Sequence, residues 1–217
     1  MCGRFALAYS KQEIEKYLNI QIPFEFEPRY NIAPTQDSLV ICSEDKLPLM
    51  MHWGLLPFWA KGKDIKEQIN ARCEGIESKP MFRDAFKKRR CLVITSGFFE
   101  WLKLDKDGKS IKQPFYITPK ENHPMIFAGI WERNEEGESN QAGFCILTTE
   151  ANSMVSKYHQ RMPVMLEKDE INQWLNNSND MIKLSNVFEP KPSKLIKAKM
   201  VSMMVNSARN DNPDCIA

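Results

Sequence analysis

The sequence predicts an α+β protein with a mostly antiparallel, curled and barrel-like sheet that is flanked by helices. Many short segments are rich in branched and aromatic residues, and Gly, Pro, Asn and Asp separate them. Fewer segments have helical periodicity. The two kinds of segment do not alternate in the regular βαβ order of a parallel sheet, which favours an antiparallel arrangement.

The first expected element is a helix over residues 11–19. Ser10 and Glu13 have the spacing of a capping box, and apolar residues follow at helical spacing. Further helices are expected at 81–88, 152–158, 168–176 and 180–188. Strands are expected at 39–42, 49–53, 91–95, 98–102, 114–118, 125–131, 143–148, 164–166 and 198–205. We expect a polar hairpin loop at 103–112, around Asp107–Gly108, and another exposed loop at 132–141.

Length and composition predict a single domain that spans residues 1–217. The chain has 217 residues, of which 42% are apolar and 27% are charged, and its formal net charge is +2. This composition excludes a wholly disordered chain. No apolar run approaches the ~18 residues of a membrane helix, and the N-terminus does not resemble a signal peptide. We therefore expect a cytoplasmic protein without a membrane association.

The six cysteines do not have the spacing of a metal site. No two of them lie closer than 18 positions, which excludes CxxC zinc and redox motifs. Cys42, Cys91 and Cys145 lie in apolar runs and are expected to be buried. Cys2 is the exception and is not expected to be a buried cysteine of this kind. No metal and no cofactor is expected.

Cys2 follows the initiator Met1 and precedes Gly3. Removal of Met1 would leave an N-terminal cysteine, with an amine of pKa about 7.7–8.0 beside a thiol of pKa about 8.5. Such a pair captures an aldehyde: the amine forms a Schiff base, and the thiol closes a thiazolidine ring. Two alternatives stay open. Cys2 is a buried cysteine behind a retained Met1, or it is the thiolate of an N-terminal nucleophile amidohydrolase.

Two titratable residues are candidates for proton transfer. Glu100 shares a strand face with Phe98 and Leu102, so burial should raise its pKa towards neutrality. The alternative is a strand-end glutamate in solvent. His159 lies at a junction between a helix and a strand, beside Arg161. Its alternative is a purely structural histidine.

Other segments suit contact with a nucleic acid. Asn70 and Arg72 lie close together, and Arg4 follows Cys2, so guanidinium groups are available for phosphate. The aromatic segment 53–60 is broken by Gly and Pro, which favours loop aromatics that stack on unpaired bases. Two alternatives stay open. The arginines form ion pairs on the surface, and the aromatic segment packs over the hydrophobic core.

Several of these segments together resemble the SOS-response-associated peptidase (SRAP) family. The matching segments occur in order along nearly the whole chain: MCGRF at 1–5, RYNIAP at 29–34, WGLLPFW at 53–59, NAR at 70–72, RCLVITSGFFEW at 90–101 and HQRMPV at 159–164. Val205–Asn206 and residues 209–211 also look like the family. The resemblance implies an SRAP-like fold.

The resemblance also implies an enzyme-like protein that senses abasic sites in single-stranded DNA during the DNA damage response. Cys2 would form a covalent thiazolidine crosslink after removal of Met1 and so protect the lesion. Glu100 matches an acid/base glutamate, His159 a histidine that assists sugar ring opening, and Asn70 an asparagine that holds the reacting groups. The family further implies peptidase-like autoprocessing, and a Schiff-base intermediate allows AP-lyase activity.

The remaining matched positions are implied to contact DNA: Arg4, Pro34, Trp59, Arg72, Thr148 and Arg161. The expected partner is single-stranded DNA with abasic sites, bound by a monomer that is nucleoid-associated when on DNA. Arginines that grip phosphates and aromatics that stack on bases read no sequence. An amidohydrolase and a non-covalent reader of modified DNA stay open as alternatives.

Overall fold

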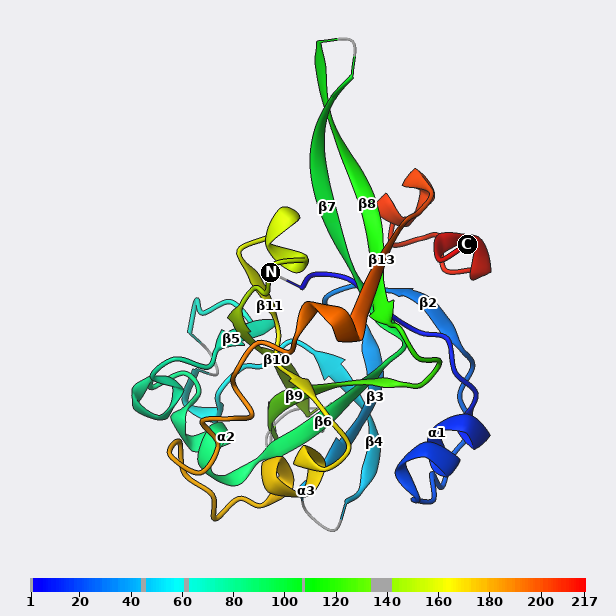
Figure 1. Cartoon of the computed structure of the whole chain (residues 1–217). Coiled ribbons are helices and arrows are strands. Elements are labelled where there is room, and N and C mark those ends of the chain that lie inside the picture. The colour runs from blue at the N-terminus through cyan, green and yellow to red at the C-terminus, as the bar shows by residue number, and fades with distance from the viewer. Residues whose placement is uncertain (1, 44–45, 61–62, 107, 134–141) are drawn as a thin grey trace.

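The strands form two sheets that pack on a shared hydrophobic core (Figure 1). The computed structural model describes residues 2–43, 46–60, 63–106, 108–133 and 142–217. Most strand pairs are antiparallel, and a few short helices lie around the sheets. The predicted α+β class with curled, mostly antiparallel sheets is therefore confirmed.

Among the described residues, the first sheet has five antiparallel strands. Their spatial order is β13 (Ile196–Met200), β8 (Lys109–Pro119), β7 (Gly97–Lys106), β1 (Phe5–Leu7) and β2 (Arg29–Ile32). The β7–β8 hairpin extends far beyond the body of the protein (Figure 1). The predicted hairpin over 103–112 is confirmed, but its loop is shorter than predicted, because the two strands stay in register as far as Lys106 and Lys109. Asp107 lies outside the described residues.

The second sheet closes on itself. Its strands are β3 (Asp37–Cys42), β4 (Pro48–Trp53), β5 (Asn70–Arg72), β6 (Arg90–Thr95), β9 (Met125–Glu132), β10 (Gly143–Glu150), β11 (Arg161–Pro163) and β12 (Met165–Leu166). Pairing runs from β10 through β4, β3, β6 and β9 back to β10. Gly143 lies at the β10–β4 contact, where a Cβ atom would overlap the carbonyl oxygen of Gly54. A residue without a side chain is therefore needed where this ring closes.

In the described part of the chain, three α-helices flank the sheets: α1 (Lys11–Leu18), α2 (Arg83–Lys88) and α3 (Glu170–Leu175). The capping box of α1 is confirmed, since the Ser10 side chain accepts from the backbone of Glu13 and the Glu13 side chain returns to Ser10. None of the helices in the described ranges has the length and apolar composition to cross a membrane.

Three expected elements differ from the structure. Residues 180–188 form turns rather than a helix, and the Gln173 side chain donates to the carbonyl of Lys183. Only the single 3₁₀ turn Val155–Lys157 forms within 152–158. Strand β13 ends at Met200, because Ser202 caps a 3₁₀ turn over Met203–Asn206. Of the loop expected at 132–141, residues 134–141 lie outside the described part of the chain.

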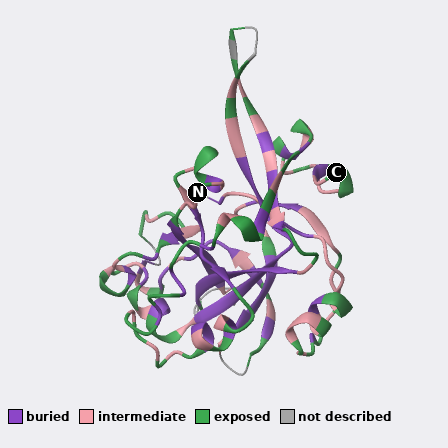
Figure 2. Ribbon diagram, in the orientation of Figure 1, coloured by how far each residue is buried: buried purple, intermediate pink, exposed green. Residues whose placement is uncertain are grey.

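Most of the core belongs to the second sheet, whose central strands β6, β9 and β10 are buried along almost their whole length (Figure 2). Phe5 of the first sheet packs against Trp53 of the second, with ring centroids 4.8 Å apart. The expected burial of Cys42, Cys91 and Cys145 is confirmed. Cys2 is also completely buried, so the expectation that it would differ from these cysteines was wrong for the chain that carries Met1. It belongs to the same core cluster.

Candidate functional site

The N-terminal segment enters the site along strand β7. Phe5 pairs with Phe98, and the carbonyl of Arg4 accepts from the amide of Phe99 at 2.9 Å. This pairing brings Cys2 close to Glu100, whose negative charge helps to raise the pKa of the Cys2 thiol. Burial is the larger cause of that increase. The thiol of Cys2 is therefore neutral at pH 7.

Asn70 connects the second sheet to this segment. It begins β5, which pairs in parallel with β10 through Ile146. The Asn70 side-chain amide donates to the carbonyl oxygen of Cys2 at 2.7 Å. The Asn70 Oδ1 atom is buried and has no hydrogen-bond partner within the described residues. One side of the Asn70 amide thus fixes Cys2, and the other side can still accept a hydrogen bond.

Glu100 lies in the middle of β7 and is only 5% exposed. Burial raises its pKa to about 7. The expected desolvation of this carboxyl group is therefore confirmed. A carboxyl group with a pKa near the working pH can both give and accept a proton.

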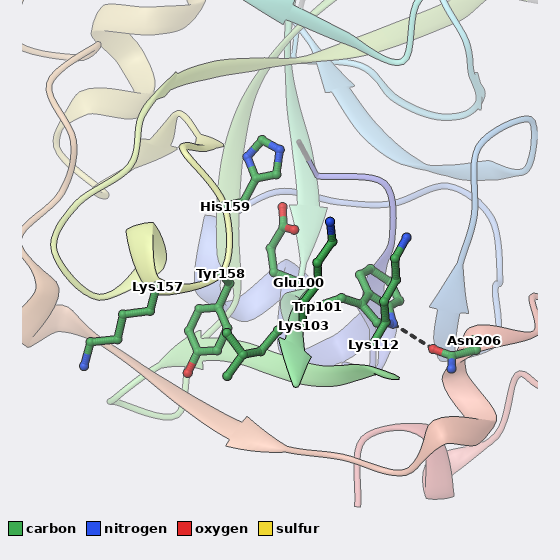
Figure 3. A pocket seen from close by; sticks show the side chains of 9 residues that line it. Glu100, Trp101, Lys103, Lys112, Lys157, Tyr158, His159 and Asn206 are labelled. Atoms are coloured by element: carbon green, nitrogen blue, oxygen red, sulfur yellow. Dashed lines mark hydrogen bonds between the residues drawn. The ribbon is translucent and has the colours of Figure 1, made fainter. Parts of the chain in front are cut away.

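His159 and Glu100 line the same pocket of about 610 Å³, where their side chains lie near one another (Figure 3). The His159 Nδ1 atom accepts from the backbone amide of Arg161 at 2.9 Å. Burial lowers the pKa of His159, so its ring is mostly neutral at pH 7. In the neutral ring the proton then lies on Nε2, which can donate a hydrogen bond into the pocket.

The three predicted phosphate-binding arginines have different surroundings. Arg4 Nη1 donates to Asn31 Oδ1 and to the carbonyl of Val205, both at 2.7 Å, so this guanidinium ties strand β1 to the C-terminal segment. Arg72 is exposed, and its guanidinium has no partner within the part of the chain that the structure describes. Arg72 is therefore the arginine that is available to a phosphate.

Arg161 already holds a carboxylate. Its two terminal nitrogens donate to the two oxygens of Glu74 at 2.6 and 2.8 Å, and it also donates to the carbonyl of Thr148 at 2.6 Å. Bidentate geometry of this kind is also the geometry with which arginine binds phosphate. A phosphate that used Arg161 would have to displace Glu74.

The other predicted DNA contacts lie on separate elements. Thr148 is buried and its hydroxyl donates to the carbonyl of Ala71 at 3.3 Å, which is a contact inside the sheet. Trp59 is half-buried, with the Lys63 ammonium 5.3 Å from its ring centre. Pro34 is half-buried in the loop after β2. Contact of these three residues with DNA stays a prediction.

The structure brings together four predicted catalytic residues, Cys2, Asn70, Glu100 and His159, but sequence reasoning missed several of their neighbours. The unassigned pocket residues include Lys103, Lys112, Lys157 and Tyr158. Tyr158 directly precedes His159, and this position next to a candidate residue could have indicated that Tyr158 lies at the pocket. Glu74 has no such signal, because only folding reveals it as the partner of Arg161. Within the described residues, no cluster of His, Cys, Asp and Glu has the arrangement of a metal site.

A curled sheet that brings the buried Cys2 close to Glu100, and a pocket lined by Glu100 and His159, characterise this site. The model of the SOS response associated peptidase (SRAP) family matches residues 1–208. The chain therefore belongs to the SRAP family.

Similar proteins support this assignment. The chain is 36% identical to the abasic site processing protein YoqW of Bacillus subtilis, over 100% of this chain and 99% of that one. It is 31% identical to the abasic site processing protein YedK of Escherichia coli, over 81% and 79% of the two chains. It is 27% identical to the abasic site processing protein HMCES of Xenopus tropicalis, over 100% and 78%.

Solved structures have the same fold. A protein from Bacteroides thetaiotaomicron superposes with a TM-score of 0.86 at 24% identity, and the match covers 99% of this chain and 98% of that one. A phage-related protein from Bordetella bronchiseptica superposes with a TM-score of 0.75 at 26% identity, covering 93% and 95%.

Proposed function

We propose that this protein captures abasic sites in single-stranded DNA by forming a covalent thiazolidine with Cys2 after removal of Met1. The adduct would protect the lesion during the DNA damage response. The proposal rests on one observation: the N-terminal segment lies beside the side chains of Glu100 and His159. Asn70 holds the carbonyl of Cys2 at 2.7 Å, and Glu100 and His159 line the adjoining pocket.

The protonation states favour an amine-first reaction. A buried thiol with a raised pKa is a poor initial nucleophile, whereas the α-amine of a mature Cys2 is partly unprotonated near pH 7. The amine adds to the aldehyde carbon, and loss of water gives an imine. The thiol sulfur then adds to the imine carbon, and the thiol proton passes to the nitrogen. Only one water molecule is released overall.

Glu100 and His159 have complementary capacities for the preceding step. An abasic sugar exists mainly as a cyclic hemiacetal, and its opening moves a proton from the hydroxyl at the anomeric carbon to the ring oxygen. Glu100, with a pKa of about 7, can remove the first proton. His159 can donate a hydrogen bond from Nε2 to the ring oxygen, and the protonated Glu100 then delivers its proton to that oxygen. The same Glu100 carboxylate is then placed to assist loss of water from the carbinolamine.

Removal of Met1 is part of the proposal. Cys2 is fully buried in the chain that carries Met1, so the sugar needs the space and the free amine that processing creates. The family name contains the word peptidase, and we propose that such an activity performs this processing. An imine intermediate would also allow strand cleavage by a Schiff-base lyase route.

DNA binding is proposed to depend mainly on phosphates. Arg72 is exposed and unpaired within the described residues, and Arg161 offers a bidentate fork once Glu74 is displaced. Arg4, Pro34, Trp59 and Thr148 complete the proposed contacts. Such contacts carry no base specificity, so binding should be independent of sequence and weakened by salt.

The experiment is a denaturing gel of the protein mixed with a single-stranded oligonucleotide that carries one abasic site. The wild-type protein should give a shifted covalent band, and Cys2→Ala should give none. Cys42→Ala is the matched control, because it removes another buried cysteine and should keep the band. Intact mass of the adduct should equal the Met1-free protein plus the DNA minus one water.

The same assay separates the alternatives. Unchanged crosslinking by Cys2→Ala would overturn the proposal. Salt-sensitive binding without any covalent band in the wild type would indicate a non-covalent reader. Release of ammonia from glutamine, lost in Cys2→Ala, would indicate an amidohydrolase.

A further inference from the structure

The β7–β8 hairpin presents two lysines to the pocket that holds Glu100 and His159. Lys103 and Lys112 are register partners on the two strands, and both line the pocket of about 610 Å³ (Figure 3). Both side chains are exposed. The sequence predicted a polar hairpin loop here and gave these two lysines no functional role.

Neither ammonium group has a counter-charge among the residues that the structure describes. Directly opposed residues of an antiparallel pair have Cβ atoms about 5 Å apart, and like charges at this spacing are destabilising. Within the described residues, neither lysine forms an ion pair within 4.0 Å of a carboxylate, although Asp105 lies on the same face of the hairpin. An anion between the two lysines would remove this repulsion.

The surroundings favour the backbone of a nucleic acid strand as that anion. Lys157 adds a third positive charge to the rim, whereas Glu100 is the carboxyl group that lines the pocket. Tyr158 presents an aromatic ring, packed 4.8 Å from Phe115. The Trp101 indole is fixed by its hydrogen bond to Asn206 Oδ1 at 2.7 Å (Figure 3). A cationic rim beside aromatic rings is typical of surfaces that bind single strands.

We propose that Lys103 and Lys112 form a clamp for one backbone phosphate of the single strand that leaves the lesion pocket. This inference rests on the proposed function for the identity of the strand. The clamp lies on the hairpin, whereas Arg72 and Arg161 lie on β5 and β11. The strand would therefore be held by two sets of cations that belong to different sheets, with the reacting sugar between them.

The test measures equilibrium binding of a fluorescent, lesion-free single strand by anisotropy at several NaCl concentrations. Lys103→Gln/Lys112→Gln is compared with Lys87→Gln/Lys88→Gln, which removes the same charge from the exposed end of α2. The clamp variant should bind on the order of three- to ten-fold more weakly at low salt. The slope of log K against log salt should become shallower by about 0.7, the value for one phosphate of a single strand. The control should change neither.

A charge-preserving variant tests whether the effect depends on charge alone. Lys103→Arg/Lys112→Arg should keep the wild-type slope of log K against log salt.

A second experiment compares two salts as competitors of the DNA strand. Sodium phosphate and sodium chloride at equal ionic strength should weaken DNA binding equally, because the clamp binds a phosphate of a strand rather than free phosphate. Stronger competition by phosphate would identify a small-anion site and overturn the proposal.

The outcomes also distinguish this proposal from the function on which it rests. An unchanged slope in Lys103→Gln/Lys112→Gln, or an equal loss in the α2 control, would overturn the clamp. Because the DNA lacks a lesion, this result does not depend on the Cys2 reaction. A slope change together with absent crosslinking of abasic DNA would keep the clamp and overturn the proposed function.

Discussion

The side-chain amide of Asn70 donates to the carbonyl oxygen of Cys2 at 2.7 Å. This bond joins a residue of the closed second sheet to the segment that leads into the first sheet. The N-terminal segment is thereby fixed at a point where a chain end would otherwise be free to move. Chemistry that depends on the N-terminal amine needs this kind of positioning.

Asn70→Asp should slow crosslinking of abasic DNA by about ten- to a hundred-fold, because loss of the donor releases Cys2 from its position. Single-turnover formation of the covalent band measures the rate. Affinity for lesion-free DNA should change much less. Asn122→Ala, an exposed asparagine that accepts from Tyr9, should leave the rate unchanged. A wild-type rate in Asn70→Asp would show that this bond has no part in the reaction.

Glu100→Gln should change the pH dependence of stability. The carboxyl group has a pKa of about 7 in the folded state and about 4.5 when unfolded, so the folded protein holds the proton more tightly. Its contribution to the free energy of unfolding is complete below pH 4.5 and is lost as the pH rises through 7, by about 3 kcal/mol at most.

Urea denaturation of wild type and Glu100→Gln at pH 5 and pH 8 measures this difference. The variant should gain stability relative to wild type as the pH rises between these values. A difference that stays constant with pH would show that Glu100 is ionised normally in the folded state. In the crosslinking assay, Glu100→Gln should also react more slowly and lose the pH dependence near 7.

Glu74→Gln should strengthen binding to single-stranded DNA by about two- to five-fold, because it frees the Arg161 fork for phosphate. The side chain of Glu74 is 52% exposed, so loss of the ion pair should cost less than about 1 kcal/mol of stability. Anisotropy with a labelled single strand measures the affinity. Glu77→Gln removes one charge nearby and is the control. Equal effects of the two variants would show that the gain in affinity comes from the lost negative charge and not from the release of Arg161.

Asn31→Ala should destabilise the protein by about 2–4 kcal/mol, because it leaves several buried polar groups without partners. Asn31 is fully buried, accepts from Arg4 and donates to three carbonyls of the C-terminal segment, those of Val205, Ser207 and Asn210. Chemical denaturation measures the loss. A change below 0.5 kcal/mol, similar to that of an exposed asparagine, would contradict the assigned role.

The sequence by itself determined the features that depend on local pattern. The capping box of α1 follows from Ser10 and Glu13, and the long central strands follow from runs of branched and aromatic residues. The burial of Glu100 followed from its place between large apolar residues. The family followed from ordered segments along the whole chain.

Tertiary structure decided the features that depend on distant partners. Strands β1, β5 and β11 are three residues each, too short for a periodic signal, and they form only because a neighbouring strand accepts their hydrogen bonds. For the same reason, the pairing of Asn70 with Cys2 and of Arg161 with Glu74 has no counterpart in local sequence. The hairpin lysines become opposed only once the register of β7 and β8 is set, since register is a property of two strands and not of either one.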